Sequence, residues 1–246
     1  MKKYFLKSLA ILVLFTLVSS CKKTEVTKEV FADSYINSIV GTNGTPVFAM
    51  IHSAYSFTKM TGVIVKGATG STTTLQNFNG DGFAFYMDVA DKSLYKAAIP
   101  SAESFTYNVT YSDGTTATKV NSVAAKSILP AQQMVLSKDA INITLKWQAV
   151  VNCEAYKVSI SRVDSVFSTS LKVNTLIYQS SYLVPKDATT DLSIPFAITS
   201  FPPSDSYTDR KLVGFKFDVA AFIFEQGQDS FEAVSTASKI ADISKL

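Results

Sequence analysis

The chain has 246 residues, and its 23 Lys and Arg residues nearly balance its 20 Asp and Glu residues. Three of the lysines, Lys2, Lys3 and Lys7, lie in an N-terminal segment that we expect to be removed, which would leave equal numbers of basic and acidic residues. A neutral chain lacks the positive field that supports binding to nucleic acid, so no nucleic-acid partner is expected. The length suits one large domain or two ordinary ones.

Residues 1–20 have the plan of a secretory signal peptide. The three lysines are followed by an apolar run from Leu9 to Val18 and by the small pair Ser19 and Ser20. A basic start, a short apolar run and a small-residue exit are typical of such signals. The run is shorter than the roughly 20 apolar residues that a membrane-spanning helix needs.

Cys21 follows this segment directly. Leu17-Val18-Ser19-Ser20-Cys21 resembles the lipobox of bacterial lipoproteins, although glycine or alanine is commoner than serine just before the cysteine. The resemblance implies cleavage before Cys21, lipidation of its thiol and acylation of the new amino terminus, with chains such as palmitate. Two or more acyl chains anchor a protein stably to a membrane. The alternative is an ordinary cleaved signal with the cysteine nearby by chance.

Residues 21–32 mix charged residues with Thr and Val without a clear period, which predicts a short solvated tether carrying the lipid. Position 22 is Lys22 rather than Asp. In the lipoprotein family an aspartate there is associated with retention in the inner membrane, so the resemblance implies the outer membrane. Whether the protein faces the periplasm or the cell surface is left open.

Strand-forming residues dominate the remainder of the chain. Val, Thr, Tyr and Phe recur in short runs bounded by Gly, Asn, Asp, Ser or Pro, a spacing typical of β-sandwiches and barrels. The segment 124–130 ends in Pro130 and is the expected boundary between domains at 33–125 and 126–246. In the first half, strands are expected at 34–39, 47–56, 62–66, 72–78, 83–89, 94–99, 105–111 and 115–123.

Two hairpin turns are predicted in the first half. Asp113-Gly114 and the stretch 79–82 combine Asp or Asn with Gly, which adopts the positive φ of tight turns readily. The second stretch also imitates the spacing of an EF-hand calcium loop, with acidic or amide residues at alternate positions and Asp88 at the twelfth. The imitation has two carboxylates and is followed by strand-like alternation, so a hairpin is predicted and no metal site.

The second half alternates more regularly. Ile141, Ile143, Leu145 and Trp147 fall on one face of a predicted strand, which makes Trp147 a core residue rather than a ligand platform. Further strands are expected at 155–162, 212–224 and 231–239.

A tryptophan that ends one strand, a tyrosine that opens the next, a long penultimate strand and a serine-rich last strand resemble a fibronectin type III domain over about residues 130–242. The stretch 165–206 is longer than the corresponding region of that family. The first half, with "NGDGFAFYMDV" and "FTYNVTYSDGTTAT", resembles an immunoglobulin-like domain of bacterial cell-surface proteins. Together the resemblances imply an all-β chain with two tandem β-sandwiches after the signal peptide. They imply adhesion, spacing or ligand display, and no particular activity.

No catalytic residue and no cofactor are predicted. The single histidine, His52, alternates with Met50 and Ala54 within the strand 47–56, which predicts a sheet residue rather than a catalytic base. Lipidation of Cys21 would leave Cys153 without a partner, and its place between two strand-like runs predicts a buried core or turn residue. No nucleophile elbow, phosphate loop or His/Cys metal spacing is present in the sequence.

Two classes of function remain from the sequence. The first is a membrane-anchored, non-enzymatic envelope lipoprotein that binds a glycan or an envelope protein, as an accessory of glycan or nutrient uptake. The second is a structural or adhesive spacer. A carboxylate-dependent glycosidase comes third, because two acids can meet from distant strands.

Aromatic rings stack on sugars, and four aromatic residues of the irregular stretch are the ligand-binding candidates, with core filling as their alternative role. These are Tyr178, Tyr182, Phe201 and Tyr207. Asp164-Ser165-Val166 also resembles an O-glycosylation sequon of some Gram-negative bacteria, a short pattern that recurs by chance, and whether Ser165 is glycosylated is left open.

Overall fold

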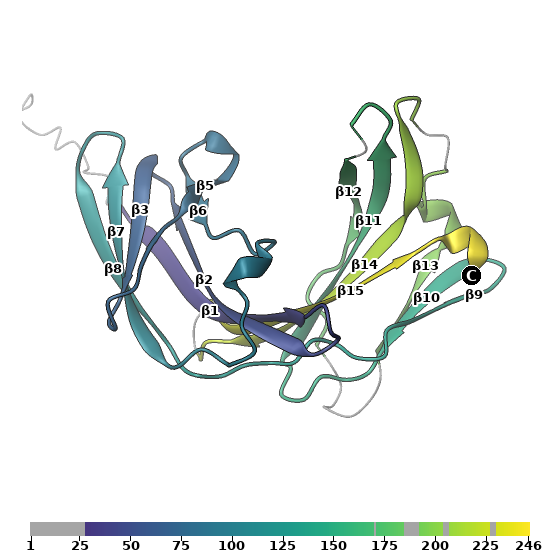
Figure 1. Cartoon of the computed structure of the whole chain (residues 1–246), viewed down its shortest axis with the longest axis horizontal. Coiled ribbons are helices and arrows are strands. Elements are labelled where there is room, and N and C mark those ends of the chain that lie inside the picture. The colour runs from purple at the N-terminus through teal and green to yellow at the C-terminus, as the bar shows by residue number, and fades with distance from the viewer. Residues whose placement is uncertain (1–27, 170, 185–191, 204–206, 227–229) are drawn as a thin grey trace, which may run out of the picture.

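The computed structural model describes residues 28–169, 171–184, 192–203, 207–226 and 230–246, and this part of the chain is built from β-strands and four short 3-10 helices. The predicted all-β class is confirmed. Most strands belong to one long sheet of eight strands, ordered β12-β11-β14-β15-β1-β2-β6-β5 (Figure 1). Their bounds are β12 (Lys172–Gln179), β11 (Ala155–Val166), β14 (Arg210–Phe224), β15 (Phe231–Ala241), β1 (Val30–Val40), β2 (Pro46–Ser56), β6 (Ala84–Tyr86) and β5 (Gln76–Asn77).

Two smaller sheets complete the fold. One is ordered β13-β10-β9 and the other β4-β3-β7-β8. Their strands are β13 (Leu192–Ala197), β10 (Asn142–Trp147), β9 (Val135–Lys138), β4 (Thr72–Thr74), β3 (Met60–Gly67), β7 (Glu103–Tyr111) and β8 (Thr116–Val123). The short helices are η1 (Phe78–Gly80), η2 (Lys92–Leu94), η3 (Ile198–Ser200) and η4 (Ile243–Lys245).

The two halves of the chain are joined by a parallel strand pair. β1, at the start of the described chain, pairs with β15 at its end, with Ile36 opposite Ala233 and Ile39 opposite Thr236. β1 also pairs with β2 in an antiparallel hairpin over the whole length of both strands. Two separate tandem sandwiches are therefore not shown, because the pairing of β15 with β1 carries one sheet through both halves. The predicted domain limits themselves stay a prediction.

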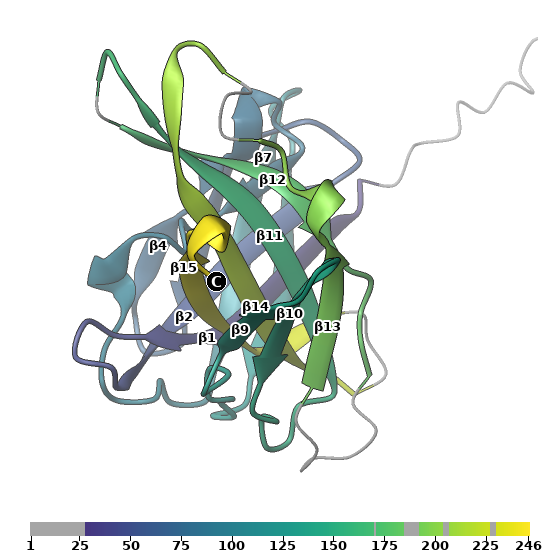
Figure 2. The same ribbon diagram turned by 90° about the vertical axis from the view of Figure 1, so that its right-hand side faces the viewer.

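Each small sheet covers one end of the long sheet. Ile143, Leu145 and Trp147 of β10 are buried together with side chains of β11, β14 and β15 in one apolar core. A second core joins Val63 and Val65 of β3 to side chains of β1, β2 and β7. Figure 2 shows β9, β10 and β13 lying across β11 and β14. Burial of apolar surface, at about 25 cal/mol per Å², is the main force that holds these layers together.

The opposite face of the long sheet is concave. Figure 1 shows the sheet curving like a trough, with β3, β7 and β8 outside one arm and β9, β10 and β13 outside the other. Strands twist and coil intrinsically, so a sheet of eight strands curls when its ends are covered on the same side. Because side chains alternate along a strand, the odd-numbered residues of β1 point into this concave face while Ile36 points into the covered core.

The predicted strand positions hold for most of the chain, with identifiable differences. The expected strand at 94–99 is instead the end of η2 and an extended segment that makes an isolated bridge between Phe48 and Lys96. Tyr95 of this segment is buried against Ala49 and Ile51, so its apolar residues cover β2 rather than adding a strand beside it. The predicted irregular stretch, which carries Tyr178 and Tyr207, contains two strands, β12 and β13, in which polar and apolar residues alternate over short runs.

Both predicted turns of the first half are confirmed. Gly114, with a φ of 82°, turns the chain between β7 and β8. The stretch 79–82 links β5 to β6, and it contains Asn79, Gly80 and Gly82 at positive φ. The Oδ1 atoms of Asn77 and Asp81 accept hydrogen bonds from the backbone N–H groups of Gly82 and Phe83, so these side chains stabilise the turn.

His52 lies within β2, as predicted, and the structure shows it to be a buried member of a hydrogen-bonded chain. Its Nδ1 lies 2.9 Å from the Oγ of Ser34, which lies 2.6 Å from the Oη of Tyr107, which donates to the carbonyl of Asp33 at 2.5 Å. Because the Tyr107 proton goes to that carbonyl, the Ser34 hydroxyl donates to Tyr107, and a neutral His52 donates from Nδ1 to Ser34. The chain ties β1 to β2 and to β7.

The predicted burial of Trp147 and Cys153 is confirmed. Trp147 is 1% exposed, and its ring lies edge-on to that of Tyr156 with the ring centroids 5.5 Å apart. Cys153 is buried and its Sγ donates to the carbonyl of Ala155 at 3.0 Å, while burial raises the pKa of its thiol. Ile141, placed on the same face as Trp147 by alternation, is an exception, since it precedes β10 and is 70% exposed. No helix in the described part of the chain is both long and apolar enough to cross a membrane.

Replacing Trp147 by alanine should lower the free energy of unfolding by about 3 to 5 kcal/mol, because the cavity left by an indole cannot be filled by the surrounding β-sheet core. Trp147→Phe should be partly tolerated, since it retains an aromatic ring against Tyr156. Urea unfolding followed by circular dichroism measures both, and an unchanged midpoint for Trp147→Ala would contradict the packing.

Candidate functional site

A hollow lies at one end of the concave face. It has a volume of about 680 Å³ and is bordered by the start of β1, the end of β2, β6, η1 and residues of β8 and of the segment before β15. We call it the aromatic pocket. The lining residues used below are Phe31, Asp33, Tyr55, Phe78, Tyr86 and Lys119.

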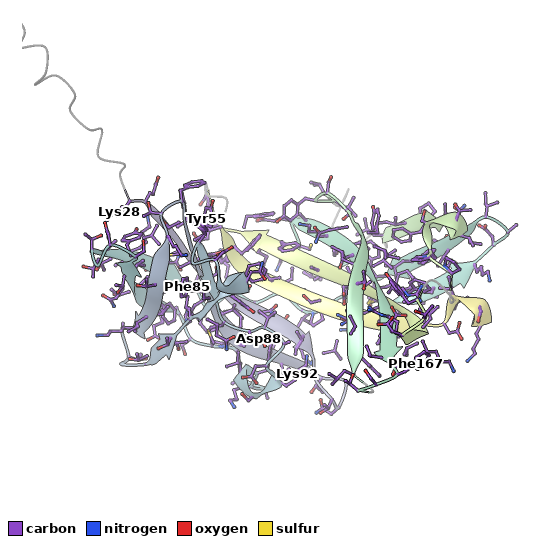
Figure 3. All side chains as sticks on the ribbon, turned by 90° about the horizontal axis from the view of Figure 1, so that it is seen from above. Lys28, Tyr55, Phe85, Asp88, Lys92 and Phe167 are labelled. Carbon is purple, nitrogen blue, oxygen red and sulfur yellow. The ribbon has the colours of Figure 1, made fainter. Side chains whose placement is uncertain are left out.

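Exposed aromatic rings form the walls of the aromatic pocket. Phe31 and Tyr55 face each other directly across the β1–β2 pair, and their ring centroids are 6.1 Å apart. Phe57, just beyond β2, packs edge-on against both rings. Phe31 is 46% and Tyr55 41% exposed, so the burial of these rings is incomplete. Figure 3 looks down onto the molecule and shows Tyr55 standing clear at the edge of this half.

A second aromatic pair stands on the other side of the pocket. The rings of Phe78 in η1 and Tyr86 in β6 meet edge-on with their centroids 5.5 Å apart. The hairpin turn at 79–82 places them there, because it folds η1 back over β6. Two aromatic pairs held by hairpins therefore border one hollow, an arrangement in which a flat, partly apolar ring could be stacked.

Asp33 supplies the buried acid of this site. Its Oδ2 accepts a hydrogen bond from the backbone N–H of Phe231 at 3.2 Å, whereas its Oδ1 is buried without a hydrogen-bond partner in the described part of the chain. Burial, opposed by the Phe231 hydrogen bond and aided by the charge of Glu225, raises the pKa of Asp33 to about 6. A ligand hydroxyl or other donor would satisfy Oδ1 and offset its desolvation.

Glu225 is the acidic neighbour of Asp33, and its own oxygens are occupied. Oε2 accepts from the hydroxyl of Ser230 at 2.6 Å and Oε1 from the amide of Asn121 at 3.4 Å. It borders a second, more polar hollow that shares Lys119 with the aromatic pocket. Within the described residues, no group of three or more His, Cys, Asp or Glu side chains is arranged to hold a metal ion.

The ligand-binding residues predicted from the sequence do not come together. Phe201 is a core residue, 8% exposed and packed edge-on against Phe215. Tyr178 lies in β12 on the covered side of the sheet, where its ring meets that of Phe196. Tyr182 lies on the concave side, against Phe222 and Phe224. Among the described residues, no ring contact joins any two of the four predicted residues.

Tyr207 packs against two arginine side chains. Its ring centroid lies 4.9 Å from the guanidinium carbon of Arg162 and 4.6 Å from that of Arg210. Arg162 is fully buried and pairs with the equally buried carboxylate of Asp164 at 2.8 Å, so Tyr207 covers an internal ion pair. Asp164 is also the acid of the predicted sequon, and Ser165 beside it is paired on both sides within the sheet. Cys21 lies outside the described residues.

Sequence reasoning missed the residues of the aromatic pocket. One signal was present: in the strand 47–56 the alternation that buries Met50 and Ala54 sends Tyr55 to the other face, where an aromatic residue needs an explanation. The pairing of Phe31 with Tyr55 and the approach of Asp33 to Phe231 depend on strand neighbours, which no local pattern specified.

Comparison with known proteins leaves the family of this chain open. No family model matches it, and no curated protein matches it by sequence. Among solved structures, a chain described as "Biofilm associated protein - BSP domain" matches with a TM-score of 0.23 and 14% sequence identity. The match covers 87% of this chain and 30% of that chain, so this protein spans less than a third of that structure. The similarity is to a β-rich protein and is weak.

The pH dependence of stability should reveal the shifted pKa values of His52 and Asp33. Burial lowers the pKa of His52 from 6.5 to about 4, so the stability it contributes is present above about pH 6.5 and is lost as the pH falls toward 4. Burial raises the pKa of Asp33 from 3.8 to about 6, so its contribution is present below about pH 4 and is lost as the pH rises through 6.

These two effects oppose each other between pH 6.5 and 4, each being on the order of 2 to 3 kcal/mol. Asp33→Asn should therefore lose more free energy of unfolding on acidification over this range than the wild type, and His52→Gln should lose less. Urea titrations at pH 6.5 and 4.5 measure the difference. Equal losses in all three proteins would show that neither group has the shifted pKa.

Proposed function

We propose that the protein is a lipid-anchored, non-enzymatic binding protein of the bacterial envelope, and that the aromatic pocket holds a glycan. The observation that carries the proposal is the exposed Phe31–Tyr55 pair beside a carboxylate oxygen of Asp33 that receives no hydrogen bond from the described residues. Sugars present apolar C–H faces and hydroxyl donors together, and that combination matches an aromatic wall next to an unpaired acceptor.

The lipobox-like sequence at Cys21 supports the anchoring part of the proposal. A tether from Cys21 to Val30 could extend over about 30 Å at most, given roughly 3.3 to 3.6 Å per residue. The first residues of β1 border the aromatic pocket. An acylated Cys21 would therefore keep this pocket within a short distance of the membrane surface, as suits an accessory of glycan or nutrient uptake at the outer membrane.

We also propose that each half derives from a tandem sandwich of the kinds that the sequence resembles. The strand grouping β13-β10-β9 against β12-β11-β14-β15 supports a fibronectin type III-like origin of the second half. The grouping β4-β3-β7-β8 against β1, β2 and β6 supports an immunoglobulin-like first half. A spacer or adhesive role is compatible with the same architecture, and the exposed aromatic pocket favours ligand binding over it.

A carboxylate-dependent glycosidase is a second candidate, favoured by one observation. Asp33 has a pKa raised to about 6 with Glu225 close enough to contribute to the shift, and a raised carboxyl beside a second carboxylate is the requirement for general acid catalysis on a glycosidic bond. The two hydrogen bonds that occupy Glu225 favour binding without cleavage. Chromatography of a bound glycan after prolonged incubation separates the two, since shortened products would identify an enzyme.

Cys21→Ser should release the protein from membranes, because the acyl chains are the strong membrane contact in this proposal. Detergent phase partitioning measures it: the wild type should enter the detergent phase, and the variant should stay uncleaved or move to the aqueous phase. Cys153→Ser, which leaves the lipobox intact, is the matched control. Partitioning of both the wild type and Cys21→Ser into the aqueous phase would refute the anchor.

Tyr55→Ala and Phe31→Ala should each weaken glycan binding about 5- to 30-fold, because truncating an aromatic wall removes stacking contacts worth about 1 to 2 kcal/mol. A glycan array identifies the ligand, and affinity gels measure the variants. Phe167→Ala is the matched control, since Phe167 is also an exposed phenylalanine, with 64% of its surface accessible. Figure 3 shows that it lies in the other half of the molecule. Binding unaffected by either pocket variant would place the ligand elsewhere.

A further inference from the structure

A further hollow, distinct from the polar one beside Glu225, lies on the concave face at the other end of β1. It has a volume of about 470 Å³ and is bordered by the end of β1, the segment from Val89 to Tyr95 that includes η2, and residues of β14 and β15. We call it the Asn37 pocket. The lining residues that carry the argument are Asn37, Ile39, Lys92, Tyr95, Lys216 and Ser238.

Asn37 provides a buried acceptor without a donor. It is 5% exposed, its Nδ2 donates to the Oη of Tyr95 at 2.7 Å, and its Oδ1 has no hydrogen-bond partner in the described part of the chain. The orientation of the amide follows from Tyr95, whose hydroxyl has one proton and donates it to the carbonyl of Val89 at 3.0 Å. Tyr95 must then accept from Asn37, which leaves the Asn37 oxygen as the unpaired atom.

Two lysines are the charged residues that line the Asn37 pocket. Lys216 is paired with Asp218 at 2.8 Å, and Ser238 donates to the same carboxylate. Lys92 lies above the ring of Tyr95, with Nζ 5.8 Å from the ring centroid, and forms no ion pair with a described residue. The nearby carboxylates of Asp88 and Asp91 accept backbone hydrogen bonds from Ala90 and Ser93. The Lys92 ammonium can therefore pair directly with an anionic group of a ligand.

The two pockets share one strand and one face. Phe31 and Asp33 border the aromatic pocket, Asn37 and Ile39 border the Asn37 pocket, and Tyr35 stands between them by the same alternation. Asn37 lies four positions after Asp33, which is about 13 Å along a strand. Figure 3 shows Tyr55 and Lys92 at separate places on the same half of the molecule.

We propose that the Asn37 pocket is a second subsite for the same ligand, and that the ligand is an acidic glycan, with a sugar hydroxyl donating to Asn37 Oδ1 and a carboxylate paired with Lys92. This deepens the proposed function and rests on it. The aromatic pocket stacks against one sugar ring, and the Asn37 pocket binds the carboxylate of another ring further along the glycan.

The test uses affinity gels with the detergent-solubilised full-length protein. Each gel contains a uronate polysaccharide (polygalacturonate, alginate or hyaluronate) or its carboxyl-reduced counterpart, which keeps the chain and removes the charge. At least one uronate polymer should bind about tenfold more tightly than its reduced form, and Lys92→Gln should abolish that difference. Lys146→Gln is the matched control: it makes the same change of charge at an exposed position of β10, in the small sheet outside the other arm.

Three results would overturn the second subsite: none of the uronate polymers is bound, the charged and reduced polymers bind equally, or Lys92→Gln behaves like Lys146→Gln. Tyr55→Ala keeps this failure distinct from that of the proposed function. If Tyr55→Ala loses binding to neutral glycans while Lys92→Gln changes nothing, the aromatic pocket stands and the second subsite does not. If the wild type binds no glycan at all, both proposals fail.

Discussion

The parallel pairing of β1 with β15 is the constraint on which the rest of the structure depends. It joins the first and last strands of the described chain, so that two groups of strands with separate apolar cores share one sheet. It also sets the backbone N–H of Phe231 against the Asp33 carboxylate. Without it β1 and β15 would each be an open sheet edge, which proteins usually protect because unpaired strands template association. The pairing therefore covers two strand edges as well as connecting the two halves.

The concave face follows from that junction. The small sheets cover the same side of the long sheet, which leaves the other side free except where Tyr95 and its neighbours pack on β2. Both hollows of this face border β1, and each contains one buried polar atom without a partner among the described residues, Asp33 Oδ1 and Asn37 Oδ1. Buried polar atoms are nearly always paired in folded proteins. The third such atom in the described part of the chain, Trp147 Nε1, lies in the core, so the two on β1 are the ones that the proposed glycan could reach.

The two faces of β1 differ in how completely their polar groups are hydrogen-bonded, and the proposed binding uses the less complete face. On the covered face, the hydrogen bonds from His52 through Ser34 and Tyr107 to the Asp33 carbonyl are complete and fix β1 against β2 and β7. On the concave face, Asp33 and Asn37 each form one side-chain hydrogen bond, while the Oδ1 atom of each has no partner among the described residues. A rigid, fully bonded side supports a face whose acceptors are already oriented, and this lowers the entropic cost of binding.

The sequence by itself determined the all-β class, the Asp113-Gly114 and 79–82 turns, the place of His52 within a strand, and the buried state of Trp147 and Cys153. Most of these depend on period-two alternation or on the φ preference of glycine, which are local properties. Local pattern left undecided which strands become neighbours. The β1–β15 pair brings together residues about two hundred positions apart in the chain, and their contact depends on the packing of both cores rather than on either segment. Only the tertiary structure could therefore show the continuous sheet, its concave face and the meeting of Phe31, Asp33 and Tyr55. It also shows Phe201 in the core and Tyr207 over a buried ion pair, because the loops that carry them pack against strands distant in the sequence.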